Sequence, residues 1–273
     1  MKYAICNETF LEWPFEQACN FARECGYTGI EIAPFMFDND VRNISSQQRA
    51  QIKQQADAAG LEVVGLHWLL AKTTGLHLTS PDASVRQATA DYIKELVHCC
   101  GDLAAGVMVF GSPLQRNLAE GMSLEQGHEL AAEVFRQVVP VLEQRQVVLA
   151  LEPLGPTEGN FLNTADEGVQ LMERIDSPTV RLHLDTKAMS SEPTPIPDII
   201  RKHAGVMAHF HANDPNKLGP GFGELDFVPI FQALKDVNYD GWVSVEVFDY
   251  SPGVERLAKE SIDYMRKCES QLT

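Results

Sequence analysis

The sequence contains few basic residues and no long hydrophobic segment. Its 273 residues include 22 Lys and Arg against 38 Asp and Glu, which gives a formal net charge of −16 at pH 7. This balance argues against a nucleic-acid-binding surface and against docking on anionic lipid, because both need clustered Lys and Arg. No segment approaches the roughly 18 uncharged apolar residues of a membrane-spanning helix, and the first residues lack an apolar run of signal-peptide length. We therefore expect a small molecule or a metal ion as the ligand, and neither nucleic acid nor a membrane as a partner.

The six cysteines form no C-x-x-C pair, the spacing that zinc sites and redox motifs use. Four of them lie on the apolar stripes of expected helices, at Cys19, Cys99, Cys100 and Cys268. This pattern argues against a disulfide framework and predicts buried, reduced thiols. The expected location is therefore the cytoplasm.

Short apolar runs alternate with amphipathic segments along the whole chain. Residues 84–103 and 254–268 show the apolar spacing of helices with one buried face. Eight apolar runs are expected to be strands: Tyr3–Cys6, Gly29–Ala33, Glu62–Leu66, Gly106–Phe110, Val147–Glu152, Val180–Asp185, Val206–His211 and Trp242–Val247. Strands that alternate with helices pair in parallel, because parallel neighbours need a crossover. Eight such units predict an α/β fold, a single (β/α)8 TIM barrel that forms one domain over residues 1–273.

The alternative architecture is an open, doubly wound parallel sheet. That fold has a glycine-rich phosphate-binding turn after its first strand. The first expected strand is followed here by Asn7-Glu8-Thr9-Phe10, which contains no glycine. The barrel is therefore the favoured architecture.

Four polar residues stand where four consecutive expected strands end: Glu152, Asp185, His211 and Glu246. They are separated by 33, 26 and 35 residues, each close to the length of one strand–helix unit. In a barrel this spacing places them together on the C-terminal rim, where enzymes of this fold carry their active sites. Three carboxylates in one apolar mouth repel one another unless a cation shares their charge. Oxygen ligands with one imidazole suit Mn²⁺ or Mg²⁺, and Co²⁺ or Zn²⁺ is the alternative.

Each rim residue taken alone could instead cap a helix or join a surface ion pair. Four in register on successive strands are not independent of one another, so the set predicts a metal site. His183 and His209 lie two residues earlier on their strands and share the same face. We expect them either to orient metal ligands or to be ordinary core histidines.

Sequence motifs at these strand ends resemble a known family. The motifs are LEPLGPTEGNFLNT (Leu151–Thr164), RLHLDTKAM (Arg181–Met189), HFHANDPN (His209–Asn216), GPGFGELD (Gly219–Asp226), WVSVEVF (Trp242–Phe248), GLHWLL (Gly65–Leu70) and GSPLQR (Gly111–Arg116). In order and spacing they are similar to the sugar phosphate isomerase/epimerase family with the xylose-isomerase-like TIM barrel. Within that family the chain most resembles the D-tagatose/D-psicose 3-epimerases. The resemblance covers nearly the whole chain.

This resemblance implies one divalent metal ion held by Glu152, Asp185, His211 and Glu246. It also implies that Glu152 and Glu246 act as acid and base on opposite faces of the substrate. Glu158 matches a carboxylate that contacts the end of the substrate and the first glutamate.

The chain departs from the family pattern at three places. Ala188 stands where these epimerases carry a histidine that polarises the reacting carbonyl, and Lys187 lies beside it. Lys217 occupies a position where the family more usually has an arginine, so the fork geometry of a guanidinium is lost. Gly155-Pro156 replaces an Asn-Arg pair. We expect Lys187 or Lys217 to bind the substrate and to replace the missing histidine as the electrophile.

Further substrate contacts are expected near the ends of the third, fourth and eighth strands. His67 is a candidate contact, and Trp68 and Phe248 are candidates to pack against the apolar face of a sugar. Arg116 is a candidate site for a phosphate or carboxylate of the substrate, with a surface ion pair as the alternative.

Together these features predict a metal-dependent sugar isomerase or epimerase that removes the proton next to a ketose carbonyl through an enediolate. Return of a proton to the same carbon gives 3-epimerisation, and return to the neighbouring carbon gives aldose–ketose isomerisation. A lyase similar to inosose dehydratases and a non-catalytic sugar-binding protein are the alternatives. DNA-repair endonucleases with this fold need a trinuclear zinc cluster and a basic groove, which the acidic composition argues against. By analogy with the family we expect a homodimer or homotetramer.

Overall fold

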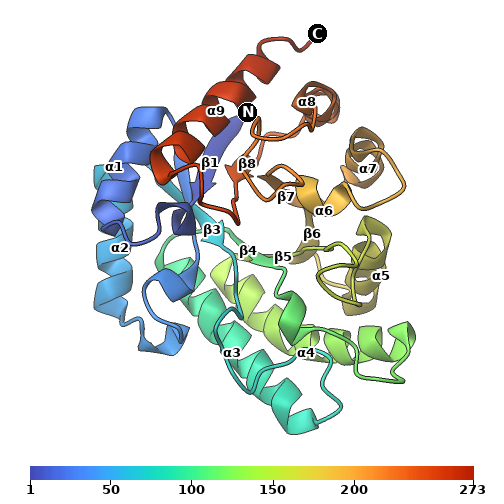
Figure 1. The fold of residues 1–273 in the computed structure, drawn as a ribbon. Helices are drawn as coiled ribbons and strands as arrows, with labels where there is room; N and C mark the ends of the chain where they lie inside the picture. Colours follow the sequence, from blue (N-terminus) through green and yellow to red (C-terminus); the bar gives the residue numbers. More distant parts are fainter.

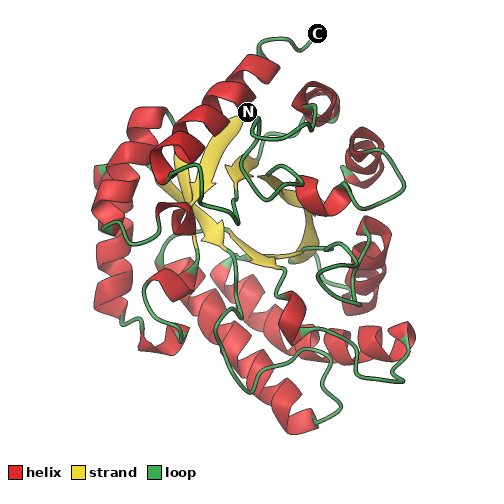
Figure 2. Ribbon diagram, in the orientation of Figure 1, coloured by secondary structure: helices red, strands yellow, loops and turns green.

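A closed barrel of eight parallel strands forms the centre of the molecule, and helices cover its outside (Figures 1 and 2). The computed structural model describes all residues from Met1 to Thr273. Each strand pairs with the next, and β8 closes the ring on β1. The strands are β1 (Lys2–Cys6), β2 (Gly29–Ile32), β3 (Glu62–Leu66), β4 (Val107–Phe110), β5 (Val148–Leu151), β6 (Val180–Asp185), β7 (Met207–Ala212) and β8 (Trp242–Val245). The predicted barrel is confirmed, and every predicted strand ends within two residues of the observed one.

The helices form the outer layer that the amphipathic segments predict. They are α1 (Phe15–Cys25), α2 (Ser46–Ala58), α3 (Ala83–Asp102), α4 (Leu124–Arg145), α5 (Ala165–Ile175), α6 (Thr186–Met189), α7 (Ile196–His203), α8 (Phe227–Asp236) and α9 (Val254–Glu269). Short 3-10 helices are η1 (Asn7–Phe10), η2 (Pro34–Met36), η3 (Val41–Asn43) and η4 (Pro113–Gln115). Capping boxes at Ser45 and Ser123 begin α2 and α4, because each serine accepts from the third helical N–H. None of these helices combines the length and the apolar composition that a bilayer crossing requires.

Successive side chains of each strand point alternately out of and into the barrel, which gives two separate apolar regions. Leu149 of β5 points outward into the main core of 68 buried residues, between sheet and helices. Its neighbour Ala150 belongs to a small separate cluster with Ala4, Val64 and Val107. This cluster lies inside the barrel, because successive side chains of a strand point to opposite faces. All six cysteines are buried and unpaired, as the sequence predicts.

Strands β3 and β4 approach closely at Gly65, whose partner across the ladder is Val107. A Cβ at Gly65 would lie 2.5 Å from both the Cγ1 atom and the carbonyl oxygen of Val107. We therefore expect Gly65→Ala to lower the free energy of unfolding by about 1–3 kcal/mol, because a strand must shift to make room. Urea unfolding followed by circular dichroism measures this change.

Gly106→Ala is the matched control, since a Cβ there would meet no atom within 4 Å. It should change the unfolding free energy by less than about 0.5 kcal/mol. Equal effects of the two substitutions would contradict the close approach at Gly65.

Candidate active site

The four predicted rim residues lie together at the C-terminal mouth of the barrel. Asp185 ends β6, His211 is the penultimate residue of β7, and Glu152 and Glu246 directly follow β5 and β8. All four are buried. The strand register brings them together, because Asp185 pairs with His211 across β6 and β7.

Glu152, His183, Asp185 and His211 form a compact cluster. One potential ligand atom of each lies within 4.8 Å of the others. The Asn213 side chain donates to Oδ2 of Asp185 at 2.6 Å and so fixes that carboxylate.

His183 is fully buried, yet neither of its ring nitrogens has a hydrogen-bond partner. Its Nε2 atom lies 3.6 Å from Oε1 of Glu152, which is too long for a hydrogen bond. A buried polar atom without a partner costs free energy, and imidazole and carboxylate groups at this spacing are typical metal ligands. The cluster can therefore hold a divalent metal ion.

Glu246 adjoins this cluster through His211 and faces a second group of side chains. Its Oε2 atom lies 3.1 Å from Nδ1 of His211. Its Oε1 atom accepts a hydrogen bond from the indole N–H of Trp68 at 2.9 Å and lies 3.2 Å from Nδ1 of His67. The structure thus gathers three of the four predicted ligands in one cluster and places the fourth at its edge. The four-ligand set remains a prediction.

Two buried carboxylates in the mouth were not identified from the sequence. Glu31 of β2 is fully buried, 2.8 Å from Nε2 of His209 and 3.1 Å from Nε2 of His211. A charge in the middle of an otherwise apolar strand is the signal that identifies such a residue. Glu8 of η1 lies 2.9 Å from Nε2 of His67. The sequence identifies Glu8 less clearly as a buried residue, because a charged residue after a strand is usually exposed.

Burial and neighbouring charges shift the pKa values of the three rim carboxyls in different directions. Burial, with repulsion from Glu246 and Asp185, raises the pKa of Glu152 well above its usual range. Burial and Glu246 also raise the pKa of Asp185, to about 6. Burial acts in the same sense on Glu246, but His211 and His67 outweigh it and lower the pKa of that carboxyl. Glu152 and Asp185 therefore repel each other and Glu246, and the charges of neighbouring basic groups offset this repulsion only in part, so a divalent cation would reduce it further.

Two of the four rim residues, Glu152 and Glu246, border a narrow cavity of about 110 Å³. Trp68 and Phe248 form part of its wall, with ring centroids 6.0 Å apart. The backbone of Trp68 is left-handed, with φ of 53°, which is strained for a bulky residue. Gly111 leaves room for the Glu152 carboxylate, since a Cβ there would overlap its Oε2 atom. His67, Ser112, Glu152, Glu158 and Glu246 are the polar and charged side chains that line the cavity.

The two predicted substrate-binding lysines lie in different surroundings. The Nζ atom of Lys187 donates to Oε1 of Glu158 at 2.8 Å and lies 4.6 Å from the ring centroid of Phe248. Burial lowers the pKa of Lys187, but Asp185 and Glu158 outweigh it, so the pKa is raised. Lys217 is exposed, and its side chain does not line the cavity. Only Lys187 is therefore close to the cavity wall.

Arg116 is not on the surface, which corrects the expectation of a surface ion pair. Its side chain is 1% exposed, and its guanidinium donates to the carbonyl oxygens of Glu152 at 2.7 Å and Leu162 at 3.3 Å. The loop after β5 causes this burial, because it folds over the guanidinium. Burial also lowers the pKa of Arg116 to about 10. Its donors face backbone carbonyls, and it does not line the cavity.

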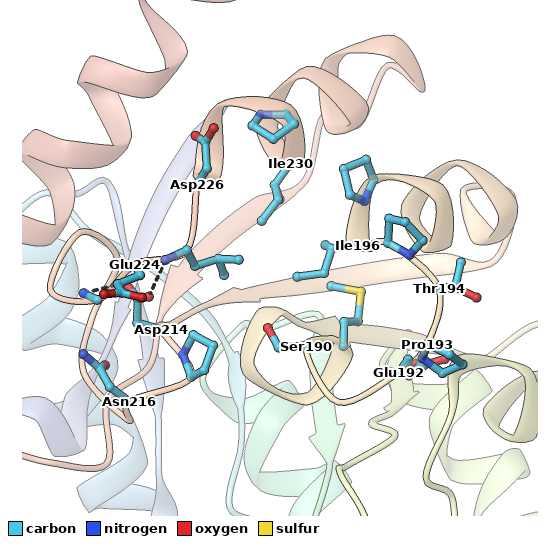
Figure 3. A pocket seen from close by; sticks show the side chains of 17 residues that line it. Ser190, Glu192, Pro193, Thr194, Ile196, Asp214, Asn216, Glu224, Asp226 and Ile230 are labelled. Carbon is cyan, nitrogen blue, oxygen red and sulfur yellow. Dashed lines mark hydrogen bonds between the residues drawn. The ribbon is translucent and has the colours of Figure 1, made fainter.

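A larger hollow of about 780 Å³ lies outside the mouth, between residues 190–197 and the loop 214–226 (Figure 3). Its lining includes prolines and four carboxylates but no histidine, cysteine or lysine. The carboxylate of Asp214 accepts from three backbone N–H groups of its own loop at 3.1–3.2 Å. That carboxylate therefore holds the loop together.

Fold and site together define a (β/α)8 barrel with a buried carboxylate–imidazole centre at its C-terminal mouth. The chain belongs to the xylose isomerase-like TIM barrel family, whose model matches residues 19–268.

Relatives of known name agree with this assignment. The chain is 29% identical over 229 residues to the D-psicose 3-epimerase of Ruminiclostridium cellulolyticum, 82% of this chain and 74% of that protein. A match to the D-psicose 3-epimerase of Enterocloster bolteae, 38% identical over 118 residues, spans 43% of this chain and 39% of that protein. The solved structure of D-psicose 3-epimerase with D-tagatose from Clostridium cellulolyticum H10 is similar with a TM-score of 0.85 and 25% identity, over 98% of this chain and 99% of that one. The predicted family, the barrel fold and the enzyme class, an isomerase of the epimerase type, are confirmed.

Proposed function

We propose that the protein is a divalent-metal-dependent ketose 3-epimerase. The observation that carries this proposal is a pair of carboxylates, Glu152 and Glu246, that line one small cavity beside a cluster suited to a metal ion. Epimerisation next to a carbonyl needs one group to remove a proton and another to return a proton to the opposite face. The relative named D-psicose 3-epimerase, 29% identical over most of both chains, supports a ketose as the substrate.

Glu152, Asp185, His211 and Glu246 are proposed to hold the metal ion. The contacts of His211 support this set, because Glu31 occupies its Nε2 edge and leaves Nδ1 directed toward Glu246. Three carboxylates and one imidazole favour Mn²⁺ or Mg²⁺, with Co²⁺ or Zn²⁺ as the alternative. When bound, such a cation would polarise the substrate carbonyl and stabilise the charge that develops on its oxygen.

Glu152 and Glu246 exchange roles with the direction of the reaction. Each removes the proton at C-3 from one epimer and returns a proton when the other epimer reacts. Positioned acid–base groups typically supply about 10²–10⁴ in rate. His67 and Trp68 hold Oε1 of Glu246, and Arg116 supports the backbone of Glu152.

The remaining cavity residues orient the sugar. Trp68 and Phe248 in the cavity wall would pack against its apolar face, and Glu158, together with the Lys187 ammonium that contacts it, would meet its hydroxyl groups. The position of Lys187 beside the cavity supports it as the electrophile that replaces the histidine absent at Ala188. The six free, buried thiols support a reducing compartment, the cytoplasm.

The proposed reaction predicts solvent deuterium at C-3 of a ketose. Incubation of the Mn²⁺-loaded protein with a panel of free ketoses in D₂O should give the C-3 epimer with deuterium at that carbon, measured by NMR. Glu152→Gln and Glu246→Gln should each lower the rate at least about 10²-fold, because one acid–base group is lost. Glu143→Gln, which changes an exposed carboxylate, is the control. A conjugated-enone absorbance in place of the epimer would instead identify a dehydratase.

Metal binding predicts a rise in melting temperature. Mn²⁺ at about 100 times its dissociation constant should stabilise the wild-type protein by about 2.7 kcal/mol, because it binds only the folded state. Asp185→Asn should abolish this rise by removing a proposed ligand. Asp198→Asn, at an exposed position of α7, should keep it. Calorimetry with and without Mn²⁺ measures both, and an equal rise in the two variants would contradict the ligand set.

The proposed role of Lys187 predicts a loss of turnover in Lys187→Met. The epimerisation rate should fall by about 10-fold or more, because a positioned cation near the developing charge is removed. Lys94→Met, which changes a partly exposed lysine of α3 that pairs with Asp91 of the same helix, should leave the rate unchanged. Steady-state kinetics measure both variants, and wild-type kinetics in Lys187→Met would end the hypothesis.

A further inference from the structure

Glu8 is a buried carboxylate in the mouth to which the proposed mechanism gives no role. It is 3% exposed and does not line the cavity. It belongs to η1, all four residues of which are buried. The Asn7 side chain ties this helix to the end of β2 by accepting from the backbone N–H of Ala33 at 2.7 Å. Glu8 is therefore anchored within the fold and does not border the cavity.

The one close polar contact of the Glu8 side chain is with His67. Oε2 of Glu8 lies 2.9 Å from Nε2 of His67, and neither oxygen of Glu8 has a hydrogen-bond partner. Burying a carboxylate with so little compensation costs free energy. We therefore expect the charge of Glu8 to act on the imidazole of His67, its one close polar neighbour.

His67 also contacts Glu246. Its other ring nitrogen, Nδ1, lies 3.2 Å from Oε1 of Glu246, the oxygen that also accepts from Trp68. The second oxygen, Oε2, faces His211 instead. Oε1 is therefore the oxygen of Glu246 that is left on the side away from the proposed metal cluster, and Glu8 and His67 fix its position.

No equivalent arrangement supports the carboxylate of Glu152. Its side chain lies beside Gly111 and is 3.6 Å from His183, and Arg116 reaches only its backbone carbonyl. The contacts from Glu8 through His67 thus reach Glu246 but not Glu152, the other proposed acid–base group.

We propose that Glu8 is a positioning residue for Glu246, acting through His67, and that it therefore controls proton transfer on one face of the substrate only. This inference rests on the proposed epimerase function. Removing the Glu8 charge should slow removal of the proton from the epimer that Glu246 deprotonates. Removal of the proton from the other epimer, by Glu152, should continue at nearly the wild-type rate.

The test compares deuterium exchange from each epimer separately. Mn²⁺-loaded wild type, Glu8→Gln, Glu8→Asp and Glu12→Gln are incubated in D₂O with one epimer at a time, and deuterium at C-3 of the recovered starting epimer is measured by NMR. The epimer whose exchange is most reduced in Glu246→Gln identifies the face on which Glu246 acts. Glu12 is the matched control, because it is an exposed glutamate just beyond η1.

We expect Glu8→Gln to slow exchange from the Glu246 epimer by at least 10-fold and exchange from the other epimer by less than 2-fold. Glu8→Asp should show the same one-sided loss in weaker form, and Glu12→Gln should match wild type. KM and bound Mn²⁺, measured by elemental analysis, should be unchanged. If Glu8→Gln does not fold, Glu8→Asp decides the question.

Two outcomes overturn the inference in different ways. If wild type exchanges but Glu8→Gln or Glu8→Asp slows both epimers equally or neither, then Glu8 is merely structural or without effect, and the epimerase proposal stands. If wild type exchanges no ketose, the proposed function itself fails, and this inference fails with it.

Discussion

The mouth of the barrel buries five carboxylates and four imidazoles in a small volume, and their charges must be compensated there. The carboxylates are Glu8, Glu31, Glu152, Asp185 and Glu246, and the imidazoles are His67, His183, His209 and His211. A buried charge without a partner costs several kcal/mol. Glu8, Glu31 and Glu246 lie 2.8–3.2 Å from imidazoles. Glu152 and Asp185 have no imidazole at that distance, and the hydrogen bonds to Asp185 carry no charge, so a divalent cation in the cluster around His183 would compensate these two carboxylates.

Closure of the barrel is what brings these groups together. Glu31 and His209 are 178 residues apart in sequence, and His67 and Glu246 are 179 apart, yet each pair is in contact. Closing eight parallel strands into a ring brings side chains of β2 near those of β7, and side chains at the end of β3 near those at the end of β8, across a narrow interior. The interior is apolar at the level of Ala150 and polar toward the mouth. The charged side chains therefore lie at the C-terminal mouth of the barrel, and small apolar side chains fill its interior below them.

The sequence predicts the rim residues well, because parallel strands end at one edge and their spacing equals one strand–helix unit. Asp185 and His211 are therefore expected to meet, and they pair across β6 and β7. Glu31 is harder to predict, since its partners lie on the far side of the ring. The burial of Arg116 depends on how the loop after β5 folds over it, and no periodicity in the sequence encodes that. Lys187 and Lys217 could not be distinguished for the same reason, because a loop and a one-turn helix decide where each points.

The positions of Glu152 and Glu246 in the ring bear on which reaction the site can perform. A single base suffices to move a proton between neighbouring carbons, because the proton stays on one face of the intermediate. Inversion at one carbon needs two groups that reach opposite faces. Glu152 follows β5 and Glu246 follows β8, three strands further round an eight-stranded ring. In the proposed reaction, carboxylates that border one cavity from strands so far apart would reach a bound sugar from different sides. Their supports also come from different parts of the chain, the β1 and β3 loops for Glu246 and the β4 and β5 loops for Glu152. The carboxylate of Glu246 thus has its own contacts with His67 and Trp68, whereas Glu152 is held through its backbone carbonyl.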